Sequence, residues 1–334
     1  MYKNDTFPSV SIIVSSKDRR LDLNKAIDSL KNLDYPKDRF EIIVVEEGDS
    51  PQRIEGVKYI FIPRKDKIDY SYPRNLAIKD AEGEIIAFVD DDCIVVKDWL
   101  KELVSCFKEG IGGVAGGVFV KDCNSIGYCE TVLGFTGGGL QKIVESKGNI
   151  IPTTKLSTCN CAYRKEVLQK LGCFKPSSKY SGEDFDLAKR VCDSYKCLYN
   201  PNALAYHKTK SNLLKIFKWF IRRGVCEIYL VKMKTNKFTT YLWYNITRSI
   251  IIRFVLVVLL LVSIKKNTPY VYIGIYLIYY LLIFIRYSFQ WERIKNIKSL
   301  FLTPIVKLIM DIGMDCGRIA GPFILLREPL KKER

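Results

Sequence analysis

Three consecutive aspartates are the residues of this sequence with the clearest capacity for chemistry. Asp90, Asp91 and Asp92 follow directly on the apolar run at residues 85–89. The run predicts a buried strand, whereas three adjacent carboxylates at its end raise the cost of ionising one another. A divalent cation relieves that repulsion, and hard Mg²⁺ or Mn²⁺ takes oxygen ligands. Because side chains alternate along an extended segment, Asp90 and Asp92 are predicted to share one side and form the functional pair. The alternative is an acidic turn before a helix.

The elements around the triplet alternate between strands and helices. Short apolar runs that predict strands lie at residues 10–14, 42–45, 59–62 and 85–89. Residues 26–33 and 72–81 carry the apolar spacing of helices. This order predicts an α/β domain with a largely parallel sheet. Ligands of such sheets bind at the carboxyl ends of the strands, where Glu46 and Glu47 would lie close to the aspartates. The glycine-rich segments 112–113 and 137–139 are expected in loops.

The positive charge of the chain is concentrated in its C-terminal third. Residues 1–210 hold 32 basic and 30 acidic side chains, whereas residues 211–334 hold 21 and 6. A strongly basic chain can indicate a nucleic-acid partner, but this third is also the most apolar part, which indicates anionic lipid. We therefore predict membrane lipids as a partner and no nucleic acid.

Three apolar stretches in this third predict helices, at residues 249–264, 270–290 and 300–326. The first run, which is apolar apart from Arg253, and the charge-free part of the second, residues 270–285, are each about sixteen residues long, short of the roughly 20 needed to span a bilayer. Four charged side chains in the third favour an amphipathic or re-entrant helix. A transmembrane hairpin, helices lying in the interface and a buried soluble bundle remain open. We expect residues 226–334 to form a membrane-associated region and residues 1–225 a soluble domain.

The N-terminus and the cysteines predict the compartment of the soluble domain. Met1-Tyr2-Lys3-Asn4-Asp5 is not followed by an apolar core, so no cleavable signal peptide is expected. The eleven cysteines, an odd number, are expected as reduced thiols. We therefore expect a membrane-associated protein whose soluble domain is cytoplasmic.

Taken in order, the motifs resemble the family 2 glycosyltransferases of the GT-A fold over roughly residues 8–225. The motifs that carry the resemblance are the strand at 10–14, Val44-Val45-Glu46-Glu47-Gly48, Arg74-Asn75, Asp90-Asp91-Asp92 and Gly182-Glu183-Asp184. The apolar C-terminus is similar to that of membrane-associated members that make polysaccharides or lipid-linked glycans. The resemblance implies a Rossmann-like catalytic domain and a hexosyltransferase-like reaction that uses a nucleoside-diphosphate sugar.

On the donor side, the resemblance assigns Glu46 to the position that contacts the nucleobase and ribose. The family commonly has aspartates there, so this chain departs from its pattern, although a glutamate keeps the hydrogen-bond acceptor. Arg74 and Asn75 match a segment near the donor, and an exposed helix arginine with a capping asparagine is the alternative.

The resemblance also assigns a metal site. Asp90 and Asp92 match the Asp-any-Asp motif that holds Mn²⁺ or Mg²⁺ against the diphosphate, and Asp91 is expected on the donor side. His207 follows the last strand expected in the domain and matches a histidine near the metal or the diphosphate. Imidazole suits such metals, and a structural role is the alternative for a lone histidine.

Asp184 matches the catalytic base of the family, which takes the proton of the acceptor hydroxyl in an inverting transfer. Asn160 and Glu183 are expected acceptor contacts. Because helix N-termini favour acidic residues for electrostatic reasons, a structural role is the alternative for Glu183. Arg222 and Arg223 would either cover the diphosphate or rest on lipid headgroups.

Together these features predict a metal-dependent inverting glycosyltransferase at the cytoplasmic face of a membrane. It would move a sugar from a nucleoside-diphosphate sugar to a hydroxyl group of a glycan or lipid-linked acceptor. The alternatives are a polyprenyl-phosphate sugar synthase, a catalytically inactive membrane scaffold that binds nucleotide sugar, and a nucleotidyltransferase.

Overall fold

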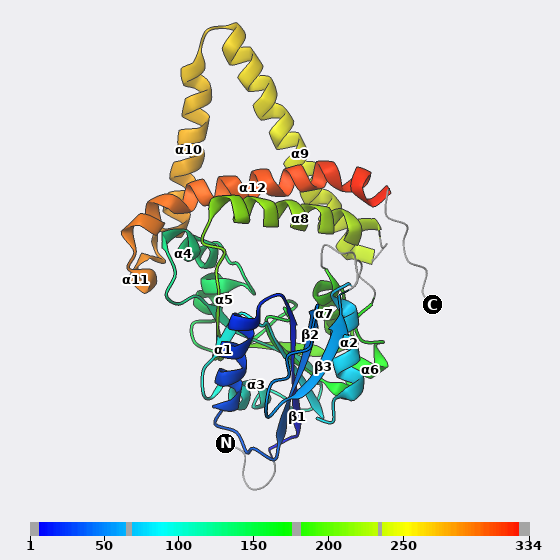
Figure 1. Ribbon diagram of the computed structural model, residues 1–334. Coiled ribbons are helices and arrows are strands. Elements are labelled where there is room, and N and C mark those ends of the chain that lie inside the picture. Colours follow the sequence, from blue (N-terminus) through cyan, green and yellow to red (C-terminus); the bar gives the residue numbers. More distant parts are fainter. Residues whose placement is uncertain (1–6, 65–68, 176–181, 233–235, 327–334) are drawn as a thin grey trace. The chain divides into compact units, whose positions relative to one another are not determined.

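The structure is a computed structural model that describes residues 7–64, 69–175, 182–232 and 236–326 (Figure 1). The chain divides into two compact units, residues 1–122 with 134–208 and residues 123–133 with 209–334. The expected boundary at residue 225 falls within α8 (Leu213–Lys232) and stays a prediction.

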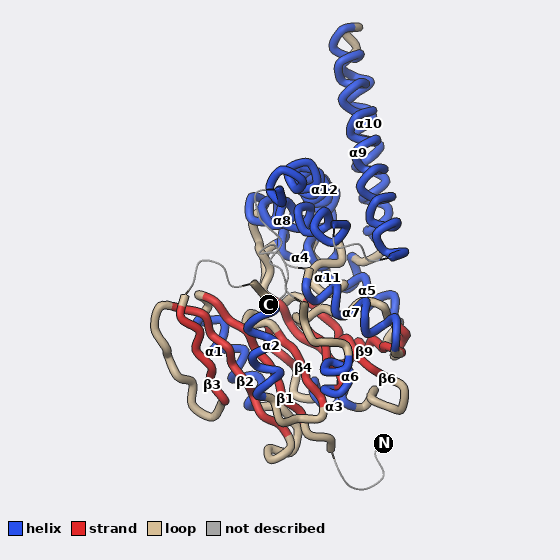
Figure 2. Tube along the Cα trace, turned by 90° about the vertical axis from the view of Figure 1, so that its right-hand side faces the viewer, coloured by secondary structure: helices blue, strands red, loops and turns tan. Residues whose placement is uncertain are grey.

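A nine-stranded sheet forms the centre of the first unit (Figure 2). Its strands are β1 (Val10–Lys17), β2 (Phe40–Gly48), β3 (Lys58–Pro63), β4 (Ile85–Val89), β5 (Cys93–Val95), β6 (Ile111–Phe119), β7 (Ile151–Pro152), β8 (Asn160–Arg164) and β9 (Lys196–His207). The strand order is β3-β2-β1-β4-β8-β6-β9-β5, and β7 pairs with β9. The strands from β3 to β4 are parallel, whereas β8 runs antiparallel to both neighbours. The predicted α/β class with a mostly parallel sheet is confirmed.

Helices cover both faces of this sheet. They are α1 (Arg20–Lys31), α2 (Ser71–Asp80), α3 (Trp99–Val104), α5 (Gly139–Ser146), α6 (Lys165–Lys170) and α7 (Glu183–Ser194). Side chains alternate along β1, so Ile12 packs in one core with Leu23 and Trp99, while Ile13 packs in the other with Ala77 and Leu187. Burial on two faces explains why the strands are apolar throughout.

The expectation that Gly112 and Gly113 lie in a loop is wrong, because both belong to β6. A Cβ atom on Gly113 would lie 2.8 Å from the Leu156 side chain, and one on Gly116 only 2.3 Å from the Ala203 carbonyl oxygen. Glycine is therefore required at these positions by the close approach of neighbouring segments.

The second unit is helical. Its helices are α4 (Ser125–Val132), α8, α9 (Asn236–Lys265), α10 (Pro269–Ser288), α11 (Trp291–Ile294) and α12 (Ile297–Leu326). In Figures 1 and 2, α8 and α12 lie side by side. A Cβ atom on Gly317 would lie 2.1 Å from the carbonyl oxygen of Ile221, and one on Gly224 would lie 2.2 Å from that of Met314. The two backbones thus touch where glycines face each other.

The predicted stretches at residues 249–264 and 300–326 lie within α9 and α12, and the stretch at 270–290 lies in α10 up to Ser288, where that helix ends. Within the described part of the chain, α10 is the one helix long and apolar enough to cross a membrane, judged by length and composition alone, and none of its apolar window is buried. Residues 254–265 of α9 form a shorter apolar stretch. Whether these helices span a membrane or lie in its interface stays a prediction.

Candidate functional site

Polar side chains gather at the carboxyl ends of β1, β2 and β4, all in the first unit. The aspartate triplet follows β4, and His207 ends β9, where it is paired with Cys93 of β5. The His207 Nε2 atom lies 3.3 Å from Asp92 Oδ1 and 3.9 Å from Asp90 Oδ2. The structure therefore brings together the three residues that were expected to bind a metal.

The chemistry of this cluster fits a hard divalent cation. The Oδ1 atom of Asp92 is buried and accepts no hydrogen bond from the described residues. Asp92, Cys93 and His207 each offer a ligand atom, all within 4.8 Å of one another. Burial raises the pKa of the Cys93 thiol well above its ordinary value, which disfavours a thiolate ligand. The remaining carboxylates and imidazole are ligands that suit Mn²⁺ or Mg²⁺.

The like charges of the triplet affect the pKa values of its carboxylates. Burial, and then the nearby Asp92 carboxylate, raise the pKa of Asp90. Asp91 accepts hydrogen bonds from Ser16 Oγ at 2.7 Å and Arg19 Nη1 at 3.2 Å. The triplet forms a turn, in which the Cys93 N–H donates to the Asp90 carbonyl at 3.1 Å, so the extended backbone on which the expected alternation depends is not present there. Burial raises the pKa of Asp91 to about 6. Arg19 Nη1 also donates to Asp92 Oδ2 at 2.6 Å. Arg19 belongs to none of the motifs in the sequence, so only the fold reveals its place beside the triplet.

Glu46 is fixed at the end of β2. Its Oε2 atom accepts hydrogen bonds from Arg20 Nη1 at 2.7 Å and from the Tyr59 hydroxyl at 2.6 Å. The neighbouring Glu47 pairs with Lys17 at 2.7 Å. Both glutamates are buried. The end of β2 therefore presents two carboxylates, each of which is paired with a basic side chain.

Arg74 and Glu183 form a buried ion pair, with 2.6 Å between Nη1 and Oε1. Burial raises the pKa of Glu183 to about 7, although Arg74 opposes this shift, and the Oε2 atom of Glu183 has no partner among the described residues. Burial would lower the pKa of Arg74, but the charges of Glu183, Asp90 and Asp184 outweigh it and raise that pKa. The pair therefore links α2 to the start of α7.

Asn75 positions the segment that leads toward α7. Its amide nitrogen donates to the carbonyl of Phe174 at 2.7 Å, and its amide oxygen accepts from the Phe174 N–H at 3.0 Å. The Arg74 guanidinium lies 5.7 Å from the centre of the Phe174 ring. Asn75 is thus engaged with the protein backbone, a role that the sequence alone did not indicate.

Asp184 lies in the first turn of α7, two residues after Gly182, whose φ of 111° places it in the left-handed region. Its Oδ2 atom accepts from Ser157 Oγ at 3.3 Å and its Oδ1 atom from the Phe185 N–H at 2.8 Å. The Asp184 charge is also among the causes that raise the pKa of Asp90, after burial and the Asp92 carboxylate.

The expected contact of Asn160 with an acceptor is not what the structure offers. The residue is 2% exposed, its amide oxygen accepts from Trp99 Nε1 at 2.8 Å, and its amide nitrogen donates to the carbonyls of Gly117 and Ala203. Asn160 therefore joins β8, β6, β9 and α3 in the core. Its polar atoms face the protein interior, which favours a structural role over the expected acceptor contact.

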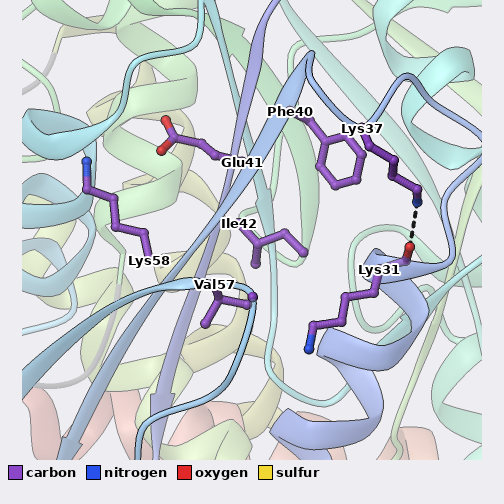
Figure 3. Close-up of a pocket in the computed structure, with 8 residues that line it drawn as sticks. Lys31, Lys37, Phe40, Glu41, Ile42, Val57 and Lys58 are labelled. Carbon is purple, nitrogen blue, oxygen red and sulfur yellow. Dashed lines mark hydrogen bonds between the residues drawn. The ribbon is translucent and has the colours of Figure 1, made fainter.

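A separate hollow of about 480 Å³ lies at the opposite, amino ends of β2 and β3 (Figure 3). Lys31 and Lys37 line it, but Lys31 donates to the Glu55 carbonyl at 2.7 Å and Lys37 to the Lys31 carbonyl at 2.6 Å. These cations thus satisfy backbone oxygens around the end of α1. Nothing in this hollow adds to the acidic site.

Comparison with known proteins agrees with this architecture. Residues 11–172 match the model of the family described as glycosyl transferase family 2. Glycosyltransferase AglE of Haloferax volcanii is 27% identical over 243 residues, which is 68% of this chain and 76% of that protein. A Campylobacter jejuni protein, GalNAc(5)-diNAcBac-PP-undecaprenol beta-1,3-glucosyltransferase, is 30% identical over 173 residues, 48% of this chain and 53% of that protein.

A solved structure shares the fold over nearly the whole chain. It is the mannosyltransferase PcManGT from Pyrobaculum calidifontis in complex with GDP-Man and Mn²⁺, with a TM-score of 0.56. The likeness covers 95% of this chain and 88% of that one at 14% sequence identity, so it bears on the fold alone.

Proposed function

We propose that this chain is a glycosyltransferase of the family 2, GT-A type that transfers the sugar of a nucleotide sugar, with inversion, to a hydroxyl group of a glycan or lipid-linked acceptor. The observation that carries the proposal is the cluster of Asp90, Asp92 and His207 at the carboxyl ends of the sheet. In open α/β sheets this edge is where ligands bind. The lipid-linked acceptor is suggested by the name of the Campylobacter relative.

Asp90, Asp92 and His207 would hold Mn²⁺ or Mg²⁺. When bound, such an ion supplies Lewis-acid neutralisation of the charge that develops on the leaving nucleoside diphosphate. The Oδ1 atom of Asp92 supports this assignment, because it is buried, accepts no hydrogen bond from the described residues and lies 3.3 Å from His207 Nε2, the other expected ligand atom. Glu46 binds the nucleoside of the donor through its carboxylate.

Asp184 serves as the general base. Its carboxylate removes the proton from the acceptor hydroxyl as that oxygen attacks the anomeric carbon, with displacement of the diphosphate on the opposite side. Arg74 places a positive charge beside Asp184, and Glu183 holds Arg74 in position. The buried Oε2 atom of Glu183, which has no partner among the described residues, supports a second role as an acceptor contact.

We also propose that the protein works at a membrane with its catalytic domain in the cytoplasm. The apolar side chains of α10 support this, because Ile273, Leu277, Leu282 and Ile285 are all more than half exposed. A contiguous apolar surface of this kind is unusual in a soluble protein.

The test is a transfer assay on detergent-purified full-length protein with a panel of nucleoside-diphosphate sugars, Mn²⁺ and lipid-linked acceptors. Wild-type protein should release nucleoside diphosphate. Asp92→Asn should lose both metal-dependent donor binding and turnover, whereas Asp184→Asn should bind the donor and lose turnover by several orders of magnitude. Full activity of Asp184→Asn with a lipid phosphate acceptor would instead identify a polyprenyl-phosphate sugar synthase. Donor binding without turnover for any acceptor would identify a scaffold, and release of pyrophosphate would identify a nucleotidyltransferase.

A further inference from the structure

Arg19 is the cation that lies directly on the aspartate triplet. It stands between β1 and α1, and a single nitrogen, Nη1, contacts Asp92 Oδ2 at 2.6 Å and Asp91 Oδ1 at 3.2 Å. Its Nε and Nη2 groups donate to no described residue, and its side chain is 52% exposed. Most of the hydrogen-bonding capacity of the guanidinium is therefore unused, although the group lies beside two buried carboxylates.

The neighbouring basic side chains form ion pairs with other carboxylates. Lys17 pairs with Glu47, Arg20 pairs with Glu46, and Arg64 bridges Asp18 and Asp49. Arg19 is the one among these residues that contacts a carboxylate expected to hold the metal. A divalent ion held by Asp92 would place two positive charges close to this guanidinium, and such charges repel each other strongly at short range.

We propose that Arg19 is a donor-binding residue that exchanges partners, leaving Asp92 for a phosphate group of the nucleoside diphosphate when the metal and the donor bind. This inference rests on the function proposed above. The planar guanidinium presents several N–H donors in a fork that matches phosphate oxygens. Because the side chain is half exposed, it can turn without disturbing the core, and the diphosphate then supplies the negative charge that Asp92 gives it in the free protein.

The proposal makes two predictions of opposite sign for the same substitution. Without the guanidinium, Asp91 and Asp92 lose a competing cation, so Arg19→Ala should bind Mn²⁺ alone about tenfold more tightly. The same variant should bind UDP or GDP in saturating Mn²⁺ about tenfold to a hundredfold more weakly, because a charge-assisted hydrogen bond is lost. Arg19→Lys, which keeps the charge but not the fork, should bind Mn²⁺ like wild type and the nucleotide more weakly.

Mn²⁺ binding is measured by electron paramagnetic resonance, and nucleotide binding by calorimetry on the full-length protein in detergent. Lys17→Ala is the matched control, since its side chain is 51% exposed at the same strand end but pairs with Glu47. It should change both affinities by less than about twofold. Thermal melting without ligand verifies that each variant is folded.

The outcomes separate the two proposals. Stronger Mn²⁺ binding together with weaker nucleotide binding in Arg19→Ala supports the exchange. Loss of both affinities together would mean that Arg19 only builds the acidic site, and unchanged nucleotide affinity would mean that it does not touch the diphosphate. Either result overturns this inference and leaves the glycosyltransferase assignment intact. Wild-type protein that is folded but binds neither Mn²⁺ nor any nucleotide would overturn both.

Discussion

Replacing Asn160 by alanine decides whether this side chain serves the fold or the acceptor. The substitution removes the hydrogen bond from Trp99 Nε1 at 2.8 Å and the two that the amide donates to the carbonyls of Gly117 at 2.7 Å and Ala203 at 2.8 Å. Trp99 is fully buried, so its indole N–H has no access to solvent. Three polar groups from three different elements would lose their partner at once.

The expected cost follows from these contacts. A buried polar group left without a partner costs about 1–3 kcal/mol. Three such groups give roughly 3–5 kcal/mol when the value for each is taken from the lower part of that range. This is a large share of the about 5–15 kcal/mol that stabilises a typical domain. For a domain of this size each kcal/mol lowers Tm by about 2–4 °C, so we expect a decrease of roughly 10 °C.

The measurement is thermal and urea unfolding of full-length protein, with donor and acceptor kinetics on the folded fraction. Asn202→Ala, at an exposed position of β9, is the control and should leave Tm unchanged. Combining Asn160→Ala with Trp99→Phe should cost less than the sum of the single changes, because phenylalanine has no N–H to leave unsatisfied. An unaltered Tm together with a raised KM for the acceptor would refute the structural role and restore the acceptor contact.

Three further predictions concern the site and the second unit. Asp184→Asn should lower kcat by several orders of magnitude while calorimetry finds donor affinity within about twofold of wild type; a loss confined to donor affinity would contradict the base assignment. In the folded protein the pKa of Glu183 is raised from 4.5 to about 7, so the folded state binds this proton more tightly than the unfolded state does. The free energy of unfolding therefore decreases as the pH rises between those two values. In calorimetric scans without metal, the Tm of wild type should therefore fall relative to that of Glu183→Gln from about pH 5 to pH 7, and the opposite slope would reject that shift. Gly317→Val should destabilise the packing of α8 on α12, because even a Cβ would lie 2.1 Å from the Ile221 carbonyl oxygen. Gly274→Val, at an open position of α10, is the control. An equal Tm for the two variants would show that the close approach of the two helices does not contribute to stability.

The sequence predicts those parts of the site that depend on local pattern. The apolar run before Asp90 and the order of strands and helices place the triplet at a strand end, and β4 does end at Val89. This prediction needs only the apolar pattern of a buried strand. The expected alternation of Asp90, Asp91 and Asp92 does not hold, because these residues form a turn and not an extended segment.

The parts that the sequence does not predict depend on contacts between distant residues. Asn160 lies 61 positions from Trp99 and 43 from both Gly117 and Ala203, so no local pattern reveals that its amide is consumed in the core. Gly112 and Gly113 suggest a loop because glycine is disfavoured in strands. The close approach of other segments to β6, which reverses that preference, exists only in the folded chain.

Arg74 and Arg19 differ in a way that determines what each can do. Arg74 is buried against Glu183, and breaking a buried pair by removing one partner costs about 3–5 kcal/mol, so it is fixed in place. Arg19 is half exposed, and an exposed pair is worth about 0–1 kcal/mol, so its partner can be exchanged at little cost. A site that must receive both a cation and an anionic diphosphate needs one positive charge that stays and one that can move. Arg74 provides the positive charge that stays, and Arg19 provides the one that can move.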